Sequence, residues 1–479
     1  MDPAGSAAGP RGGDRAPRGD RARGGRPQRG ETAADAEVRA ALHRLLDRAL
    51  DRRARIDRAR PWRPLERSTQ AALRTALPEE GTGPEALVDD LERLRLLDPP
   101  GHAHPRFFGW AIGAGTLEGA IGAVAAALTQ TNAFGGAQVA TAVDAAALRW
   151  TAELLGLPGH AAGVLTSGAS EANLLALAAA REEAAAPGGR VVASAEAHHS
   201  VTRASRLLGL GAPLRVPARD GAMDPAALAG VLDERAEPVV AVVATAGTPA
   251  SAAFDPLDAI AEVCAERGRW LHVDGAFGAW ARTAPARAGR VVGLEGARSI
   301  AIDHHKALHA PYAVGALLLD DLGPLEAAMA APSGYLRPIR GGYGGLSDWP
   351  GERALATSRP FLGLGLYTLL RGRGAGALRA EIEASYARAE RLGRLVDAWP
   401  GLERVRPVTG PAVVLRVRGQ DDRGHGRIVT RLQQDGEAVL TPASIDGAIA
   451  LRASTLNPAS TDDDLNRLLA AVTAAGRTD

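Results

Sequence analysis

Short apolar runs alternate with helical patterns between about residues 106 and 370. The runs lack strict polar alternation, which is typical of strands in a sheet that is covered on both faces. Strands alternating with helices favour an α/β domain with a largely parallel sheet, whose ligands gather beyond the carboxyl ends of the strands. The clearest strand candidates are VVASAE (191–196), VVAVVATAG (239–247), WLHVDGAFG (270–278), SIAID (299–303) and AVGALLL (313–319).

The rest of the 479-residue chain differs in composition from this large domain, which we place at 106–375. Residues 1–35 carry almost no large apolar groups, so a disordered tail is expected, with a basic arm for polyanions as the alternative. Residues 36–105 have helical periodicity. Residues 376–479 predict a small α+β domain. A long helix at about 375–398 leads into it, and it ends in a helix capped by Ser460 or Thr461.

Charge and cysteine content exclude several classes of protein. The net charge of +1 gives no electrostatic case for nucleic acid or membrane binding. No apolar run is long enough to span a bilayer, and the N-terminus lacks the apolar core of a secretory signal. The single cysteine, Cys264, excludes an internal disulfide and fits a reducing compartment. We therefore expect a cytoplasmic protein with no nucleic-acid partner, no membrane partner and no metal site.

Lys306 is the only lysine among 56 basic residues, so the other 55 are arginines. A guanidinium is always charged, whereas a lysine amine can lose its proton and form a Schiff base with a carbonyl. A single lysine retained in so arginine-rich a chain is therefore a candidate for covalent chemistry. The alternative is that one lysine remains by chance.

Two further segments match the needs of a phosphorylated cofactor. Gly168, Ala169 and Ser170 lie between a predicted strand and a helix, where backbone N–H groups can bind a phosphate. The alternative there is a plain turn with a serine cap. Asp274 ends a hydrophobic strand and needs a partner, which can be a protonated pyridine nitrogen, a helix end or a cation. With Lys306, these features predict pyridoxal phosphate, and His198 could stack on its ring.

The chain resembles the pyridoxal-phosphate-dependent group II amino-acid decarboxylases, which include the aromatic-amino-acid and glutamate decarboxylases, and it looks closest to the bacterial branch. The resemblance runs from about 100 to 475. It is carried in order by HPRFFGW, TSGASEANLLALAAAR, AEAHHSV, TAGT, WLHVDGAFG, DHHKALHAPY and LRASTLNPASTDDDL.

The resemblance implies the type I fold of pyridoxal-phosphate enzymes, with a mostly parallel seven-stranded sheet, and loss of CO₂ from an L-amino acid to leave an amine. It implies that Lys306 carries the Schiff base, that Asp274 pairs with the ring nitrogen, and that Tyr335 returns a proton after CO₂ leaves. It also implies a homodimer with active sites at the subunit interface. The implied cofactor site comprises Gly168, Ala169, Ser170, His198, Thr245, Asp274, Ala276, Asp303, His305 and Lys306, and the implied substrate site comprises Phe107, Phe108 and Arg359.

The sequence departs from the family pattern in three places. Ala307 follows the lysine where a large aromatic is usual, SRPFLGLG keeps Arg359 but loses two basic positions, and Asp303-His304-His305 replaces smaller or amide groups. The rival reactions are transamination and decarboxylation with oxidative deamination to an aldehyde, and a homologue without activity is the third alternative. The sequence leaves the substrate amino acid open.

Overall fold

The computed structural model describes residues 32–97, 101–160, 162–234, 237–331, 342–343 and 349–477. The described residues form two compact units. One contains residues 32–50 and 75–97, and the other contains residues 51–74 and the described residues from 101 onward. Most of the predicted disordered tail lies outside the described residues.

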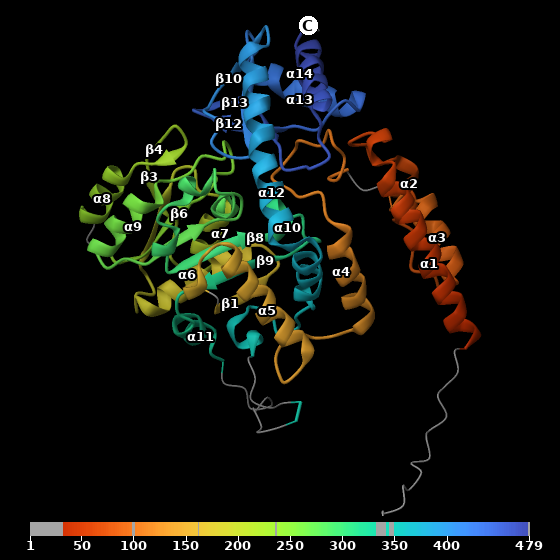
Figure 1. Ribbon diagram of the computed structural model, residues 1–479, viewed down its shortest axis with the longest axis horizontal. Helices are drawn as coiled ribbons and strands as arrows, with labels where there is room; N and C mark the ends of the chain where they lie inside the picture. The colour runs from red at the N-terminus through yellow and green to blue at the C-terminus, as the bar shows by residue number, and fades with distance from the viewer. Residues whose placement is uncertain are drawn as a thin grey trace, which may run out of the picture. The chain divides into compact units, whose positions relative to one another are not determined.

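The second unit is built on a seven-stranded sheet (Figure 1). Its strands follow the order β1-β9-β8-β7-β6-β2-β3. Only β9 runs antiparallel to its neighbours, and the remaining pairs are parallel. This confirms the mostly parallel sheet. The bounds are β1 Ala162–Thr166, β2 Arg190–Ser194, β3 Leu214–Val216, β6 Val239–Thr245, β7 Leu271–Asp274, β8 Ser299–Asp303 and β9 Gly315–Leu319.

The predicted apolar runs form these strands, and they are apolar throughout because both faces of the sheet are covered. All seven residues of β6 are buried, as are all five of β8 and all five of β9. One core cluster packs α6 and β2 side chains together, and another contains residues of α5, α9 and α12. The helices of this domain are α4 Leu117–Thr129, α5 Val139–Leu154, α6 Ala169–Glu183, α7 His199–Leu207, α8 Pro225–Asp233, α9 Leu257–Glu266, α10 His304–Ala307 and α11 Gly323–Met329.

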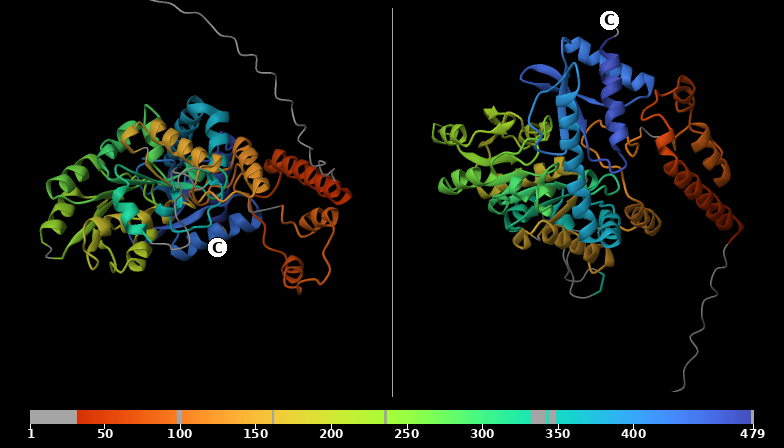
Figure 2. Two further views of the ribbon diagram at one scale, coloured as in Figure 1. Left: turned by 90° about the horizontal axis from the view of Figure 1, so that it is seen from below. Right: turned by 45° about the horizontal axis from the view of Figure 1, so that its top comes forward.

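The helix α12, Leu362–Ala398, leads from this domain to the C-terminal sheet (Figure 2). It packs against α4 and α5 near one end and against β10 and β11 near the other. Its backbone breaks at Gly374, where φ is +67°, next to the predicted helix start at 375. The C-terminal elements are β10 Leu402–Arg404, β11 Ala412–Val417, α13 Asp422–Asp435, β12 Thr441–Ile445, β13 Ala448–Ser454 and α14 Asp462–Ala475, with the sheet order β10-β11-β13-β12.

The first unit contains most of α1, Ala33–Ala54, and all of α3, Pro84–Arg93. Arg44 and Arg48 of α1 form ion pairs with acidic residues of α3, including 2.7 Å from Arg44 to Glu85 and 2.6 Å from Arg48 to Glu92. No helix in the described part of the chain is both long and apolar enough to cross a membrane.

Candidate active site

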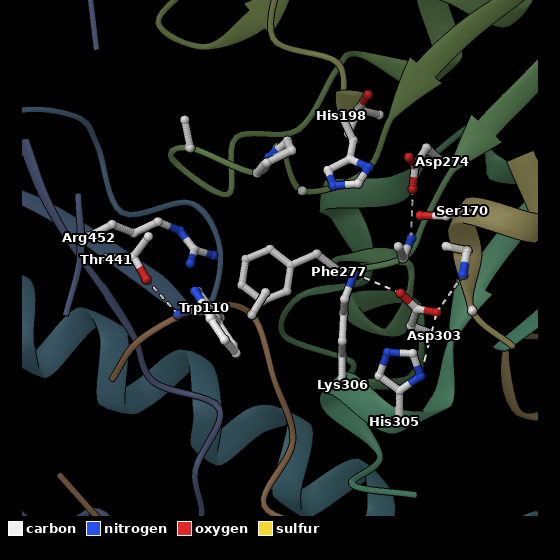
Figure 3. Close-up of a pocket in the computed structure, with 18 of the residues that line it drawn as sticks. Trp110, Ser170, His198, Asp274, Phe277, Asp303, His305, Lys306, Thr441 and Arg452 are labelled. Atoms are coloured by element: carbon white, nitrogen blue, oxygen red, sulfur yellow. Dashed lines mark hydrogen bonds and ion pairs between the residues drawn. The ribbon is translucent and has the colours of Figure 1, made fainter. Parts of the chain in front are cut away.

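A pocket of about 590 Å³ opens where β6, β7 and β8 end. The three strands are adjacent and parallel, so their carboxyl ends meet at one edge of the sheet. Register places Thr245 of β6 directly beside Asp274 of β7. Lys306 lies one helical turn beyond the end of β8 (Figure 3). The pocket is large enough for a cofactor and a small substrate.

The Lys306 amine is held by Asp303, whose Oδ2 lies 2.7 Å from Nζ. Burial opposes ionisation of this carboxyl. The charges of Lys306 and His305 and hydrogen bonds from Lys306 and Ala169 outweigh burial and keep the pKa of Asp303 below its usual value. An ionised Asp303 therefore orients the amine within the pocket.

Asp274 and His198 lie close together above the Lys306 side chain (Figure 3). The buried Asp274 carboxylate accepts hydrogen bonds from Asn173 Nδ2 at 2.9 Å and from the Ala276 N–H at 3.2 Å. Burial lowers the pKa of His198, while the charge of Asp274 opposes that shift. A neutral imidazole therefore lines the pocket beside the Asp274 carboxylate.

The turn into α6 requires glycine at position 168, where φ is +149°. A Cβ there would lie 3.3 Å from His305 Cε1 and 3.4 Å from Asp303 Oδ1. Asp303 Oδ1 already accepts the Ala169 N–H at 2.7 Å, so that group is not free for a phosphate. The Ser170 hydroxyl has no hydrogen-bond partner among the described residues, and Ser170 lines the pocket at the helix N-terminus.

The wall opposite Lys306 comes partly from the C-terminal sheet (Figure 3). β13 places Arg452 directly beside Thr441 of β12, and both line the pocket. The Arg452 guanidinium lies 5.3 Å from the centre of the Phe277 ring, and Thr441 Oγ1 accepts the Trp110 N–H at 2.7 Å. The sequence analysis missed Arg452, Thr441, Phe277 and Trp110, although three of them lie in motifs that carried the resemblance.

The predicted cofactor residues all line this one pocket. The predicted substrate residues do not. Phe107 packs with Ile112 and Val439, and Phe108 is fully buried in the core of the C-terminal elements. Arg359 lines two neighbouring cavities and donates to the Leu165 carbonyl at 3.0 Å. Apolar packing holds both phenylalanines outside this pocket, and the substrate roles implied for these three residues stay predictions.

Tyr335 falls within residues 332–341, outside the described part of the chain. Its predicted role as proton donor stays a prediction. Ala307, one of the departures from the family pattern, is buried in the core cluster beneath the large sheet.

The residues present fit pyridoxal phosphate. The pocket combines one amine, a carboxylate, a neutral imidazole and the small-residue turn at the N-terminus of α6. The buried Thr245 hydroxyl has no hydrogen-bond partner among the described residues and is available to a ligand. These are the groups that the cofactor's aldehyde, ring nitrogen, ring face and phosphate require.

Comparison with known proteins gives matches over most of the chain. Residues 67–418 match the family model described as the pyridoxal-dependent decarboxylase conserved domain. The chain is 32% identical to an L-2,4-diaminobutyrate decarboxylase of Rhizobium meliloti, covering 84% of both proteins. It is 26% identical to an aromatic-L-amino-acid decarboxylase of Bacillus atrophaeus, covering 84% of the chain and 87% of that protein. A crystal structure of Oryza sativa TDC with PLP and tryptamine matches 92% of the chain and 98% of its own, with a TM-score of 0.86 and 24% identity.

Proposed function

The chain belongs to the pyridoxal-dependent decarboxylase family and is a pyridoxal-phosphate-dependent amino-acid decarboxylase, and from this premise we propose which of its residues perform the reaction. Lys306 holds the cofactor through Nζ, Asp274 faces the ring nitrogen, and His198 covers the ring. The observation that carries this assignment is the convergence of Lys306, Asp274 and His198 on one pocket.

Pyridoxal phosphate supplies an electron sink for the electron pair left when the bond to the carboxylate breaks. The chain's own residues orient the reacting groups and control the proton. Asp303 holds the Lys306 amine at 2.7 Å, which directs Nζ into the pocket. The Asp274 carboxylate provides the negative charge that keeps a proton on a ring nitrogen beside it.

We assign the proton that replaces CO₂ to the hydroxyl of Tyr335. A donor at that point favours simple decarboxylation to an amine. A keto acid or an aldehyde as the main product would instead support transamination or oxidative deamination.

The substitution Lys306→Arg tests the assignment. An arginine keeps the charge beside Asp303 but cannot form a Schiff base, so turnover is expected to be abolished while the fold persists. Because the chain has one lysine, borohydride reduction of the loaded protein should give a single pyridoxyl-modified lysine, located by peptide mass spectrometry. Circular dichroism of the variant is the control for folding. Normal CO₂ release by the variant would overturn the assignment.

For the substrate, we propose an amino acid that presents an anionic group to Arg452. The wall formed by Trp110, Phe277, Thr441, Ser444 and Arg452 contains a positive charge and no carboxylate. Mass spectrometry of products from the proteinogenic amino acids and 2,4-diaminobutyrate would identify the substrate. Acidic amino acids are expected to be decarboxylated faster than 2,4-diaminobutyrate, and the reverse order would reject this substrate class.

We also propose a homodimer. Leu117, Ile121, Val124 and Leu128 follow one face of α4 and are 40–68% exposed. On α1, Val38, Leu42, Leu46 and Leu50 form a second stripe, 40–48% exposed. These exposed apolar stripes, one in each compact unit, support burial against a second copy.

Sedimentation equilibrium tests the dimer. The wild type is expected at twice the chain mass of 49.4 kDa. The double variant Ile121→Glu, Leu128→Glu should shift towards monomer, because charges on the α4 stripe oppose its burial. Val292→Glu is the matched control, since Val292 is 48% exposed and lies outside both stripes. A wild-type monomer would contradict the proposal.

A cytoplasmic location is part of the same proposal. Cys264 is buried, and burial raises its pKa to about 12, so the thiol is protonated and unreactive near neutral pH. The chain has no second cysteine with which it could form an internal disulfide. Cell fractionation tests the location, and recovery outside the cytoplasmic fraction would reject it.

A further inference from the structure

A buried polar network lies behind the pocket, centred on Asn173 of α6. The Asn173 side chain is fully buried, and its Nδ2 donates to Asp274 Oδ2 and to Ser200 Oγ, each at 2.9 Å. Ser200 Oγ in turn lies 2.8 Å from His198 Nδ1. One amide group thus joins the two residues that face the ring of the cofactor.

The branch through Ser200 determines which nitrogen of His198 carries the proton. The backbone N–H of Ser200 can only donate, and it donates to His198 Nδ1 at 3.3 Å. Nδ1 is therefore an acceptor, and the proton of the neutral imidazole is assigned to Nε2. The Ser200 hydroxyl, which accepts from Asn173, is free to donate to the same Nδ1.

The branch behind Asn173 determines how its amide is oriented. Asn173 Oδ1 lies 2.9 Å from His272 Nε2, and His272 Nδ1 lies 2.9 Å from Ser299 Oγ. Burial lowers the pKa of His272 to about 4, so the ring is neutral and has one proton. The Asp274 carboxylate can only accept, so Nδ2 of Asn173 must face it and Oδ1 must face His272 Nε2, which is then the donor. His272 Nδ1 is left as the acceptor for the Ser299 hydroxyl, and it also lies 3.1 Å from the Ser299 carbonyl oxygen. The Trp270 indole N–H donates to Ser299 Oγ at 2.8 Å and completes the chain.

Every donor in this network points towards the pocket. The direction runs from Trp270 through Ser299, His272 and Asn173 to the Asp274 carboxylate, and a side branch runs through Ser200 to His198. In a buried site, aligned hydrogen bonds strengthen one another. Loss of the Asn173 amide would leave Asp274, Ser200 and His272 each without one of its hydrogen-bond partners. The network ends on Asp274 and His198, the two residues proposed to face the ring.

We propose that Asn173 is a positioning residue for the decarboxylase reaction. It stabilises the charge of Asp274 and, through Ser200, holds His198 with Nε2–H towards the ligand. This inference rests on the proposed roles of Asp274 and His198. Loss of Asn173 then affects the cofactor through both residues at once, whereas loss of the Ser200 hydroxyl affects only the His198 branch.

The test compares Asn173→Leu, Ser200→Ala and the wild type, each prepared as apoprotein and titrated with pyridoxal phosphate. Asn173→Leu is expected to weaken cofactor binding by about 10- to 100-fold, since hydrogen bonds to charged groups contribute about 1.5–3 kcal/mol. It should also move the pH at which the absorption spectrum of the bound cofactor changes. Ser200→Ala should lower kcat by about tenfold, the value of one hydrogen bond of ordinary strength, and leave that spectral pH profile unchanged.

Ser205→Ala is the matched control. Ser205 is also a buried serine of α7, but its hydroxyl donates to the Val201 carbonyl at 2.8 Å and does not join the network. It should leave cofactor affinity, the spectral pH profile and kcat at wild-type values, whatever its effect on thermal stability.

Two failures are distinguishable. A wild type that gives no borohydride-trapped cofactor on Lys306 would overturn the proposed function itself. A wild type that traps the cofactor, together with an Asn173→Leu variant that folds and keeps its affinity within twofold and its spectral profile unchanged, would overturn only the role of Asn173. If Asn173→Leu does not fold, the Ser200→Ala variant tests the inference instead. A kcat for Ser200→Ala equal to that of Ser205→Ala would then reject the inference.

Discussion

Arg452 brings a buried positive charge to the pocket wall opposite Lys306. Its residue exposure is 3%, and its Nε and Nη2 atoms have no hydrogen-bond partner among the described residues. Burial lowers its pKa to about 10, so the guanidinium is still charged near neutral pH. An unpaired buried charge is costly, and a carboxylate on the substrate would satisfy it.

Replacing Arg452 tests whether its guanidinium binds a carboxylate of the substrate. Arg452→Met is expected to raise KM for an acidic substrate by about 10- to 100-fold, because a hydrogen-bonded ion pair contributes about 1.5–3 kcal/mol. Arg452→Lys, which keeps the charge but loses the bidentate geometry, should be intermediate. Steady-state kinetics separates KM from kcat.

Arg416→Met on the adjacent strand β11 is the control. Arg416 donates to backbone carbonyls, including that of Ile445 at 2.9 Å, and does not line the pocket. It should lower stability without changing KM. Equal effects of the two methionine variants on KM would show that Arg452 acts only through folding.

At the scale of single elements, the final helix shows how local sequence can specify a boundary. Thr461 Oγ1 accepts the Asp464 N–H at 3.3 Å, and the Asp464 carboxylate accepts the Thr461 N–H at 3.0 Å. This is a capping box, and three aspartates in the first turn suit the helix dipole. The sequence left Ser460 and Thr461 as alternatives. The structure selects Thr461, because the Ser460 hydroxyl donates to the Pro105 carbonyl.

Removing the cap should weaken α14. Thr461→Ala is expected to lower the free energy of unfolding by about 1 kcal/mol, because helix N–H groups lose their side-chain acceptor. Urea denaturation followed by circular dichroism measures this loss. Thr473→Ala in the last turn of the same helix is the control, and it should cost less, since alanine has the higher helix propensity. A loss at Thr461 no larger than at Thr473 would contradict the capping role.

At the scale of the whole molecule, buried histidines tie stability to pH. Burial lowers the pKa of His272 to about 4 and of His304 and His309 to about 3. Below the unfolded pKa of about 6.5, the unfolded chain binds protons that the folded chain does not, so stability falls as the pH drops towards 4. Asp144 and Asp255 act in the opposite direction, because burial raises their pKa to about 7 and about 6.

Comparing the wild type with a variant that lacks one histidine separates the effect of that histidine on the pH dependence of stability from the effects of Asp144 and Asp255. Between pH 6 and pH 4, the unfolding free energy of the wild type should fall by about 1.4 kcal/mol per pH unit more steeply than that of His304→Gln. His43→Gln is the control, since His43 is exposed on α1. Urea unfolding at saturating pyridoxal phosphate, repeated across this pH range, gives the slopes. Parallel slopes for wild type and His304→Gln would contradict a neutral, buried His304.

Much of the fold and of the cofactor site followed from the sequence, because their signals are local. Unbroken apolar runs indicated the central strands, and parallel topology brings the ends of such strands to one edge. Lys306, Asp274 and the turn at Gly168 each lie at a strand end or at a helix start, so their place near the pocket could be predicted without knowing any long-range contact.

The pocket wall opposite Lys306 and the Asn173 network were decided by the tertiary structure alone. Asn173 and His272 are 99 positions apart, and Asn173 and Ser200 are 27 apart, so no spacing rule links them. Arg452 lines the pocket because the C-terminal sheet supplies part of its wall. Phe107 and Phe108 pack in apolar clusters outside the pocket. Residue type and periodicity specify strands, helices and reactive groups, whereas side-chain partners depend on which distant segments pack together.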